Sequence, residues 1–172
     1  MIETERLRLS LHHMTDFHDL RAMWSDPDVV RHISGIPSSE QESWFRLLRY
    51  RGLWGLLGYG YWCVRTKADG RYVGDGGFAD WKREVEPPLG TVPEAGWVLA
   101  RWAHGQGFAT KALQAASAWM DGRSVDRTVC IMAPENGSSR RVAEKCGYFL
   151  KGNVRFGDRP TVLLQRDRRH QW

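Results

Sequence analysis

Apolar and polar residues alternate with a period of two in the first predicted element. In residues 5–11 (ERLRLSL) the leucines alternate with charged or polar side chains, which is typical of a half-buried strand. A helical period follows over residues 16–25, and Thr15 is the expected N-cap. Pro27 is expected to end that helix, because the residue before a proline avoids the helical conformation.

A capping-box spacing predicts the start of a second helix. Ser39 is followed three residues later by Glu42, and the apolar residues after them keep a helical period to about residue 51. Residues 52–60 are rich in glycine and predict a loop. Strands predicted at residues 59–66 and 71–78 flank an Asp-Gly pair that marks a hairpin turn. A surface loop is expected from residue 81 to residue 91.

Strands and helices alternate in the second half of the chain. The pattern predicts a strand at residues 95–100, a helix to residue 120, a strand at 127–133 and a helix from 136 to 146. Two strands, at residues 148–156 and 161–165, complete the chain. The order β α α β β β α β α β β predicts an α/β fold (α+β in its front half), with one mixed sheet and helices on both faces. We expect all 172 residues to form a single domain.

Composition and charge indicate which kinds of ligand and partner the chain is expected to bind. The chain is 42% hydrophobic and 26% charged, which are globular values, and its net charge of +5 fits an anionic ligand. Nucleic acid is not the expected partner, because the chain has no aromatic–basic motif of an RNA-binding module.

Cysteine spacing and hydropathy predict the compartment. Cys63, Cys130 and Cys146 lie far apart without a CxxC pair, so no metal site is expected. The first residues do not resemble a secretion signal, and no apolar run approaches the length of a membrane span. These features predict a cytoplasmic protein with reduced thiols and no membrane partner.

A glycine turn joins the strand at residues 95–100 to the helix that follows it. The first N–H groups of such a helix have no intrahelical partner, and glycines allow a ligand close to them, so the turn predicts a pyrophosphate cradle. The turn does not match the dinucleotide-binding motif GxGxxG, because Thr110 occupies its last position. The chain also has no Walker sequence of the kind that binds nucleoside triphosphates. Residues 104–109 (HGQGFA) fit the acyl-CoA loop R/Q-x-x-G-x-G/A, with His104 at the basic or amide position. A turn needed only for strand–helix packing is the alternative.

Two further motifs decide between these readings. Residues 136–148 contain N-x-x-S-x-x-V-x-E-K-x-G-Y, and the N-terminal region contains Thr-Glu-Arg-Leu at residues 4–7 and Ser-Asp-Pro-Asp-Val at residues 25–29. With the glycine turn, these motifs resemble the GCN5-related N-acetyltransferase (GNAT) superfamily. The branch they resemble is that of the ribosomal-protein alanine N-acetyltransferases (RimJ/RimL-like). The resemblance covers residues 3–168.

The resemblance implies a six- to seven-stranded sheet and an acetyl-CoA site. The strand before the glycine turn would carry a bulge and splay from its neighbour, with Trp97, Val98 and Leu99 along the thioester and an N–H near Leu99 facing the acetyl oxygen. Asn136 would bond the pantetheine arm and Arg140 a phosphate. The turn residues expected at the cofactor are His104, Gly105, Gln106, Gly107, Phe108, Ala109 and Thr110.

The resemblance also implies catalytic roles. An amine must be neutral to attack a thioester, so a carboxylate should accept its proton, and Glu94 occupies the expected position. Asp75 and Asp80 are the alternatives. Ser139 is expected to protonate the CoA thiolate, with Tyr148 as its alternative. No cysteine is suitably placed for nucleophilic attack, which predicts direct transfer without an acyl-enzyme.

The acceptor is expected between residues 29–57 and 80–92. Their acidic and aromatic residues suit a cationic amine, either a small molecule or a protein N-terminus. The alternative function is a CoA-binding or ribosome-associated module without turnover. Homodimers are common in the branch that the chain resembles, but nothing in the sequence fixes the oligomeric state. The residues expected in the acceptor walls are Glu40, Glu42, Trp44, Trp54, Trp81, Glu84 and Glu86.

Overall fold

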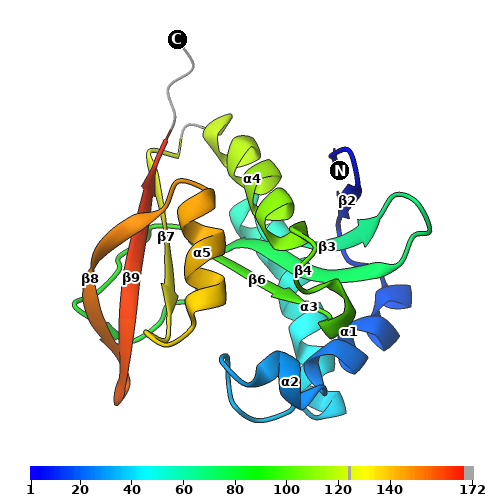
Figure 1. Cartoon of the computed structure of the whole chain (residues 1–172), viewed down its shortest axis with the longest axis horizontal. Helices are drawn as coiled ribbons and strands as arrows, with labels where there is room; N and C mark the ends of the chain where they lie inside the picture. Colours follow the sequence, from blue (N-terminus) through cyan, green and yellow to red (C-terminus); the bar gives the residue numbers. More distant parts are fainter. Residues whose placement is uncertain (124, 169–172) are drawn as a thin grey trace.

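Nine strands in the described part of the chain form one mixed sheet. The computed structural model describes residues 1–123 and 125–168, and the strand order is β1-β2-β3-β4-β6-β7-β9-β8-β5 (Figure 1). Only β6 and β7 pair in parallel. The predicted mixed α/β fold is confirmed, but the expected six to seven strands were too few. The two-residue strands β1 (Ile2–Glu3) and β5 (Val85–Glu86) are too short to produce an alternating pattern.

The remaining strands agree with the predicted order, whereas the helices include α2 (Pro27–Val30), which was not predicted. The other strands are β2 (Leu7–Ser10), β3 (Tyr61–Thr66), β4 (Tyr72–Ala79), β6 (Glu94–Leu99), β7 (Arg127–Met132), β8 (Phe149–Phe156) and β9 (Arg159–Asp167). The helices are α1 (Phe17–Trp24), α2 (Pro27–Val30), α3 (Glu40–Leu57), α4 (Phe108–Asp121) and α5 (Gly137–Lys145), with short 3-10 turns η1 (Met14–Asp16) and η2 (Arg101–Ala103).

The first helices begin at residues other than those predicted. Thr15 is not an N-cap, because the turn η1 already starts after His13, whose N–H donates to Asp16 Oδ2 at 2.7 Å. Pro27 does more than end α1. It occupies the first turn of α2, where Asp26 Oδ1 accepts the Asp28 N–H at 2.9 Å. Proline is well suited to that position, because its missing N–H would have had no partner there.

Helix α3 confirms the capping box but continues beyond the predicted end. Ser39 and Glu42 exchange both hydrogen bonds of the box. The predicted loop at residues 52–60 is wrong, because the helix runs to Leu57 and ends only at Gly58, which has a φ of 72°. Trp54 holds the last turns in place by donating its Nε1–H to the Tyr61 carbonyl at 3.0 Å.

Helices cover both faces of the sheet, as predicted. One buried cluster packs the sheet against α4 and α5, and a second packs it against α1, α2 and α3. Figure 1 shows α4 and α5 together on one face and α3 behind the strands on the other. Among the helices described, none is both long and apolar enough to cross a bilayer.

The parallel pair at the centre of the sheet separates after one residue pair. Strands β6 and β7 pair only at Glu94↔Val129, where the Val129 N–H donates to the Pro93 carbonyl at 3.1 Å. Beyond that point β6 follows β4 while β7 follows β9, and Figure 1 shows the two strands turning apart. The expected splayed pair is therefore present. The bulge expected in β6 is absent, because its pairing with β4 has no register shift from Gly74↔Leu99 to Ala79↔Glu94.

Candidate active site

The separation of β6 from β7 leaves backbone groups of β6 unpaired on one edge. Ala100 donates its N–H to the Val73 carbonyl at 2.9 Å, on the β4 side. Because the edge to which N–H groups point alternates along a strand, those of Leu99 and Trp97 point to the other edge, toward the gap. An extended chain could pair there as an added strand.

A cleft of about 1000 Å³ opens where the two strands part. Its lining comes from β6, β7 and the start of α5, from α1, α3 and the segment after β4, and from residues 31–35, 156 and 159–161. We call one part of this lining the arginine wall. It consists of Trp24, Arg46, Arg49, Trp81 and Arg83.

Glu94 is a buried carboxylate that lines this cleft. It is 6% exposed, and Arg83 Nε donates to its two oxygens at 3.0 and 2.9 Å. Burial raises the pKa of Glu94, the charge and hydrogen bond of Arg83 oppose that rise, and Asp80 adds to it. A carboxylate with a raised pKa is a better proton acceptor than an exposed one.

The two alternative carboxylates lie outside the cleft lining. Asp75 is 1% exposed and accepts hydrogen bonds from His12 Nε2 at 2.7 Å and from the Tyr72 hydroxyl at 2.6 Å. Asp80 is paired with Lys82 Nζ at 2.5 Å. Of the three predicted candidates, only Glu94 borders the cleft.

The glycine turn leaves the N-terminus of α4 open. Gly105 and Gly107 have φ values of 75° and 77°, in the left-handed region that favours glycine, and Gly107 gives α4 no side-chain cap. A Cβ at Gly105 would meet nothing within 4 Å, and one at Gly107 only Arg6 Nη2 at 3.7 Å. The open space and the first-turn N–H groups fit a pyrophosphate.

Side chains around the turn hold it to the sheet. His104 Nε2 donates to the Leu99 carbonyl at 3.0 Å, so this side chain fastens the turn to the end of β6. Gln106 donates to the Trp102 carbonyl at 2.7 Å. Arg6, which the sequence reasoning missed, donates to the Gln106 carbonyl at 2.9 Å and lies 4.7 Å from the Phe108 ring. Its only signal was its place in the Thr-Glu-Arg-Leu motif.

Asn136 and Ser139 lie together at the start of α5. Asn136 Oδ1 accepts the Ser139 N–H at 3.1 Å, which leaves the Asn136 amide as a donor, and both residues line the cleft. Arg140 is on the same helix, where its Nε donates to Glu144 at 2.9 Å. It does not line the cleft.

Tyr148 is not placed to protonate a thiolate in the cleft. Its side chain is 2% exposed, and its hydroxyl lies 2.8 Å from Thr128 Oγ1 in the core beneath α4 and α5. The proposal of Tyr148 as the alternative acid is therefore wrong. Cys130 does line the cleft, but burial raises the pKa of its thiol, and a protonated thiol is a poor nucleophile.

The acidic walls expected around the acceptor are absent from the described cleft. Glu42 belongs to the capping box, Glu40 pairs with Arg21, and Glu84 and Glu86 are exposed away from the lining. Of the three tryptophans predicted there, only Trp81 lines the cleft.

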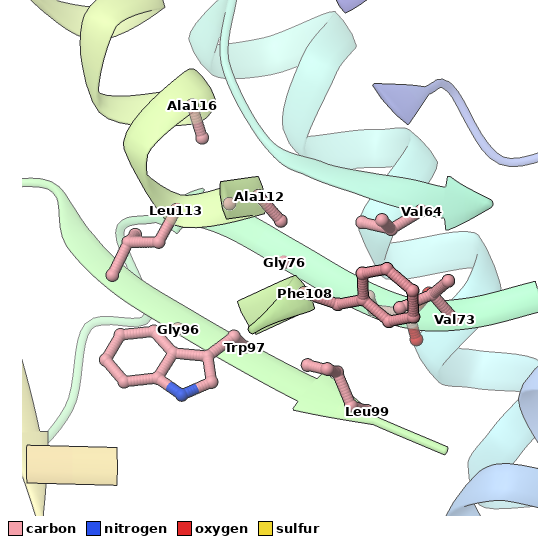
Figure 2. A pocket seen from close by; sticks show the side chains of 12 residues that line it. Val64, Val73, Gly76, Gly96, Trp97, Leu99, Phe108, Ala112, Leu113 and Ala116 are labelled. Atoms are coloured by element: carbon pink, nitrogen blue, oxygen red, sulfur yellow. The ribbon is translucent and has the colours of Figure 1, made fainter. Parts of the chain in front are cut away.

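The opposite face of β6 is apolar and closed by α4. Figure 2 shows Trp97, Leu113 and Phe108 around a cavity of about 10 Å³. Gly96 and Trp97 border both this cavity and the cleft. Glu94, by contrast, lines the cleft and not this cavity.

Comparison with known proteins adds independent evidence. The model of the acetyltransferase (GNAT) domain matches residues 6–148. YkkB of Bacillus subtilis (strain 168), an uncharacterized protein, is 28% identical over 165 residues, which are 95% of this chain and 93% of YkkB. A Bordetella pertussis protein assigned to the GnaT-family acetyltransferases is 30% identical, with a TM-score of 0.85 over 96% of this chain and 98% of that one. RimL, an acetyltransferase of ribosomal protein L7/L12 solved with coenzyme A, shares the fold at 17% identity, with a TM-score of 0.77 and 95% of each chain covered.

Proposed function

Since this chain belongs to the GNAT acetyltransferases, a family that uses acetyl-CoA, we propose that it moves the acetyl group to a primary amine by direct attack in a ternary complex. The observation that carries the proposal is the position of Glu94. This buried carboxylate lies at the point where β6 and β7 part, beside the unpaired backbone edge of β6.

Glu94 is the proposed proton acceptor. The amine nitrogen forms a bond to the acetyl carbon and loses a proton, while the carbon–sulfur bond of the thioester breaks. The raised pKa of Glu94 suits it to accept that proton, directly or through water. The N–H of Leu99 on the free edge of β6 is the proposed donor to the acetyl oxygen as that oxygen gains charge.

Residues at two helix N-termini are proposed to bind the cosubstrate. The N–H groups of the glycine turn and of the first turn of α4 would hold the pyrophosphate, and Arg6 and Lys111 add positive charge near it. The Asn136 amide would donate to the pantetheine arm, and Ser139 would donate a proton to the departing thiolate. The proposed role of Arg140 at a phosphate requires it to release Glu144.

A thiol-release assay tests the proposal. We expect acetyl-CoA and a panel of primary amines to give stoichiometric CoA thiol and acetylated amine. Tight acetyl-CoA binding without thiol release for any amine would favour the alternative, a CoA-binding or ribosome-associated module without turnover.

Rapid quenching tests the direct transfer. If an acetylated Cys130 formed and decayed at the rate of turnover, the ternary-complex mechanism would be wrong. Cys130→Ser should therefore keep its turnover.

A further inference from the structure

Two of the three arginines in the arginine wall, Arg46 and Arg49, have no carboxylate partner in the described chain. Arg46 and Arg49 both line the cleft and lie three residues apart on α3, so their side chains are neighbours on the helix surface. Neither forms an ion pair with any described residue. Arg31 and Arg83, which also line the cleft, are paired with Asp28 at 2.5 Å and Glu94 at 2.9 Å.

Arg46 is held in place by an aromatic ring and a hydroxyl. Its guanidinium carbon lies 3.6 Å from the centroid of the Trp24 ring, and its Nη1 donates to Ser38 Oγ at 3.0 Å. The side chain is half-buried, and loss of hydration lowers the pKa of its guanidinium, as does the charge of Arg49. Two cations kept together without a counter-ion are unfavourable unless an anion joins them.

One neighbouring aromatic residue also provides a hydrogen-bond donor without an acceptor. The indole Nε1–H of Trp24 is buried and has no acceptor among the described residues, whereas Trp81 hydrogen-bonds to the Tyr61 side chain. Both rings line the cleft beside the two arginines. Guanidinium and indole groups only donate, so this part of the cleft is suited to a ligand rich in acceptor oxygens.

Competing charges do not alter this conclusion. Asp75 and Glu42 both favour the charged form of Arg46, but neither lines the cleft. Asp75 is occupied by His12 and Tyr72, and Glu42 by the capping box of α3. Glu135, the other carboxylate of the lining, lies before α5. The glycine turn does not border the cleft, so the arginine wall is separate from the proposed pyrophosphate cradle.

The arginine wall and the proposed reaction centre are close enough for one small molecule. The guanidinium carbons of Arg49 and Arg83 lie 5.3 and 5.8 Å from the centroid of the same Trp81 ring, so they are at most about 11 Å apart. Arg83 in turn contacts Glu94 at 2.9 Å. A molecule of amino-acid to dipeptide size spans such a distance.

We propose, on the basis of the acetyltransferase function above, that the acceptor is a small amine with an oxyanion that Arg46 and Arg49 bind while its nitrogen reaches Glu94. A carboxylate and a phosphate share the required chemistry, since both accept paired hydrogen bonds from guanidinium groups. A polyamine or an aminoglycoside would bring positive charge to a positive wall. This inference narrows the amines expected from the sequence to those that also carry an oxyanion.

A panel of matched acceptors tests the inference. It contains α-amino acids and ω-amino carboxylates, the corresponding amides and alkylamines, aminoalkyl phosphates, spermidine and a neutral tripeptide amide. We expect kcat/KM for the oxyanion-bearing acceptors to exceed that of their amides at least tenfold, since each charge-assisted hydrogen bond contributes about a factor of ten or more. The carboxylate and phosphate series show which oxyanion is preferred. Equal or higher kcat/KM with amides, the tripeptide amide or spermidine would overturn the inference.

Variants assign the preference to the two arginines. Arg46→Gln and Arg49→Gln should each lower kcat/KM for the oxyanion-bearing acceptors about ten- to a hundredfold, with little change for alkylamines and in acetyl-CoA affinity. Arg51→Gln, an exposed charge of α3 outside the cleft, is the matched control. Arg46→Lys keeps the charge, and thermal unfolding checks that each variant folds. An equal loss for all acceptors would contradict the assignment.

Binding separates this inference from the proposed function. If no amine releases thiol, the proposed acetyl transfer is wrong. Binding of the acceptors to the arginine wall can then be measured by tryptophan fluorescence of the CoA-saturated protein. Titration with the amino carboxylates should give tighter binding than titration with their amides, and Arg49→Gln should remove the difference. Identical affinities would reject the oxyanion site whether or not the protein is an enzyme.

Discussion

The glycine turn and the arginine wall lie at different parts of the site and are built in different ways. The turn is a continuous segment, residues 104–110, and its proposed binding groups are backbone N–H donors next to left-handed glycines. The arginine wall is assembled from α1, α3 and the segment after β4, and its binding groups are side chains. The turn therefore has a local sequence pattern, and the wall has none.

The two regions should therefore differ in how well they tolerate side-chain substitutions. A backbone cradle tolerates many side chains as long as the φ angles and the open space at the glycines are kept. A wall of side chains changes its chemistry with each substitution. The acceptor preference should therefore respond to single charge changes in the wall, whereas acetyl-CoA binding should respond to backbone changes in the turn.

Glu94→Gln should have the largest effect on turnover. The amide keeps the shape of the side chain but cannot accept the amine proton, so kcat should fall roughly a hundredfold or more. Acetyl-CoA affinity, measured by calorimetry, should stay unchanged because the turn is untouched. Glu135→Gln, which changes the other carboxylate of the cleft lining, is the matched control. Unaltered turnover in Glu94→Gln would return the role to Asp75 or Asp80.

Gly107→Ala should have the second-largest effect, and this effect should be on the affinity for acetyl-CoA. Alanine at a φ of 77° costs about 1 kcal/mol, and its methyl group would occupy the space left open for the phosphate. We expect the Kd for acetyl-CoA to rise roughly tenfold, as when one hydrogen bond to a charged group is lost.

Gly70→Ala is the control for Gly107→Ala. Gly70 has a φ of 69° and open space around it, but it lies in the hairpin turn between β3 and β4. Both variants should lose similar stability in thermal unfolding, and only Gly107→Ala should weaken acetyl-CoA binding. Equal binding losses would indicate that strain alone is responsible.

The sequence predicted the mixed sheet and the turn because both have periodic or local signals. Glycines are less informative on their own. Gly52, Gly55 and Gly58 all suggested a loop, yet only Gly58 has a positive φ and ends α3. The packing of Trp54 against β3 decides where the helix ends, and that contact is invisible in the sequence.

The arginine wall could not be predicted, because helical period does not show which face a charged residue takes. Leu48 is one of the apolar residues of α3 and is nevertheless 47% exposed, while Arg46 and Arg49 line the cleft. The guanidinium groups of Arg46 and Arg49 lie over the aromatic rings of Trp24 and Trp81 on that face. Tyr148 is the opposite case. Its position in the motif suggested a residue of the site, but its side chain lies in the core.

Arg83→Gln should have the smallest effect on the rate and the most informative one on pH dependence. Arg83 links the arginine wall to Glu94, and its charge and hydrogen bond lower the pKa of a carboxylate that burial and Asp80 raise. Without Arg83 only the raising influences remain, so the pKa of Glu94 rises further above its ordinary value of 4.5. The deprotonated carboxylate is the active form, and the acid limb of kcat/KM should therefore move to higher pH. Arg83→Lys should move the limb less, and Glu84→Gln, an exposed neighbour, should leave it in place. A shift to lower pH would show that the limb reports a group other than Glu94, and would separate the arginine wall from the proton transfer.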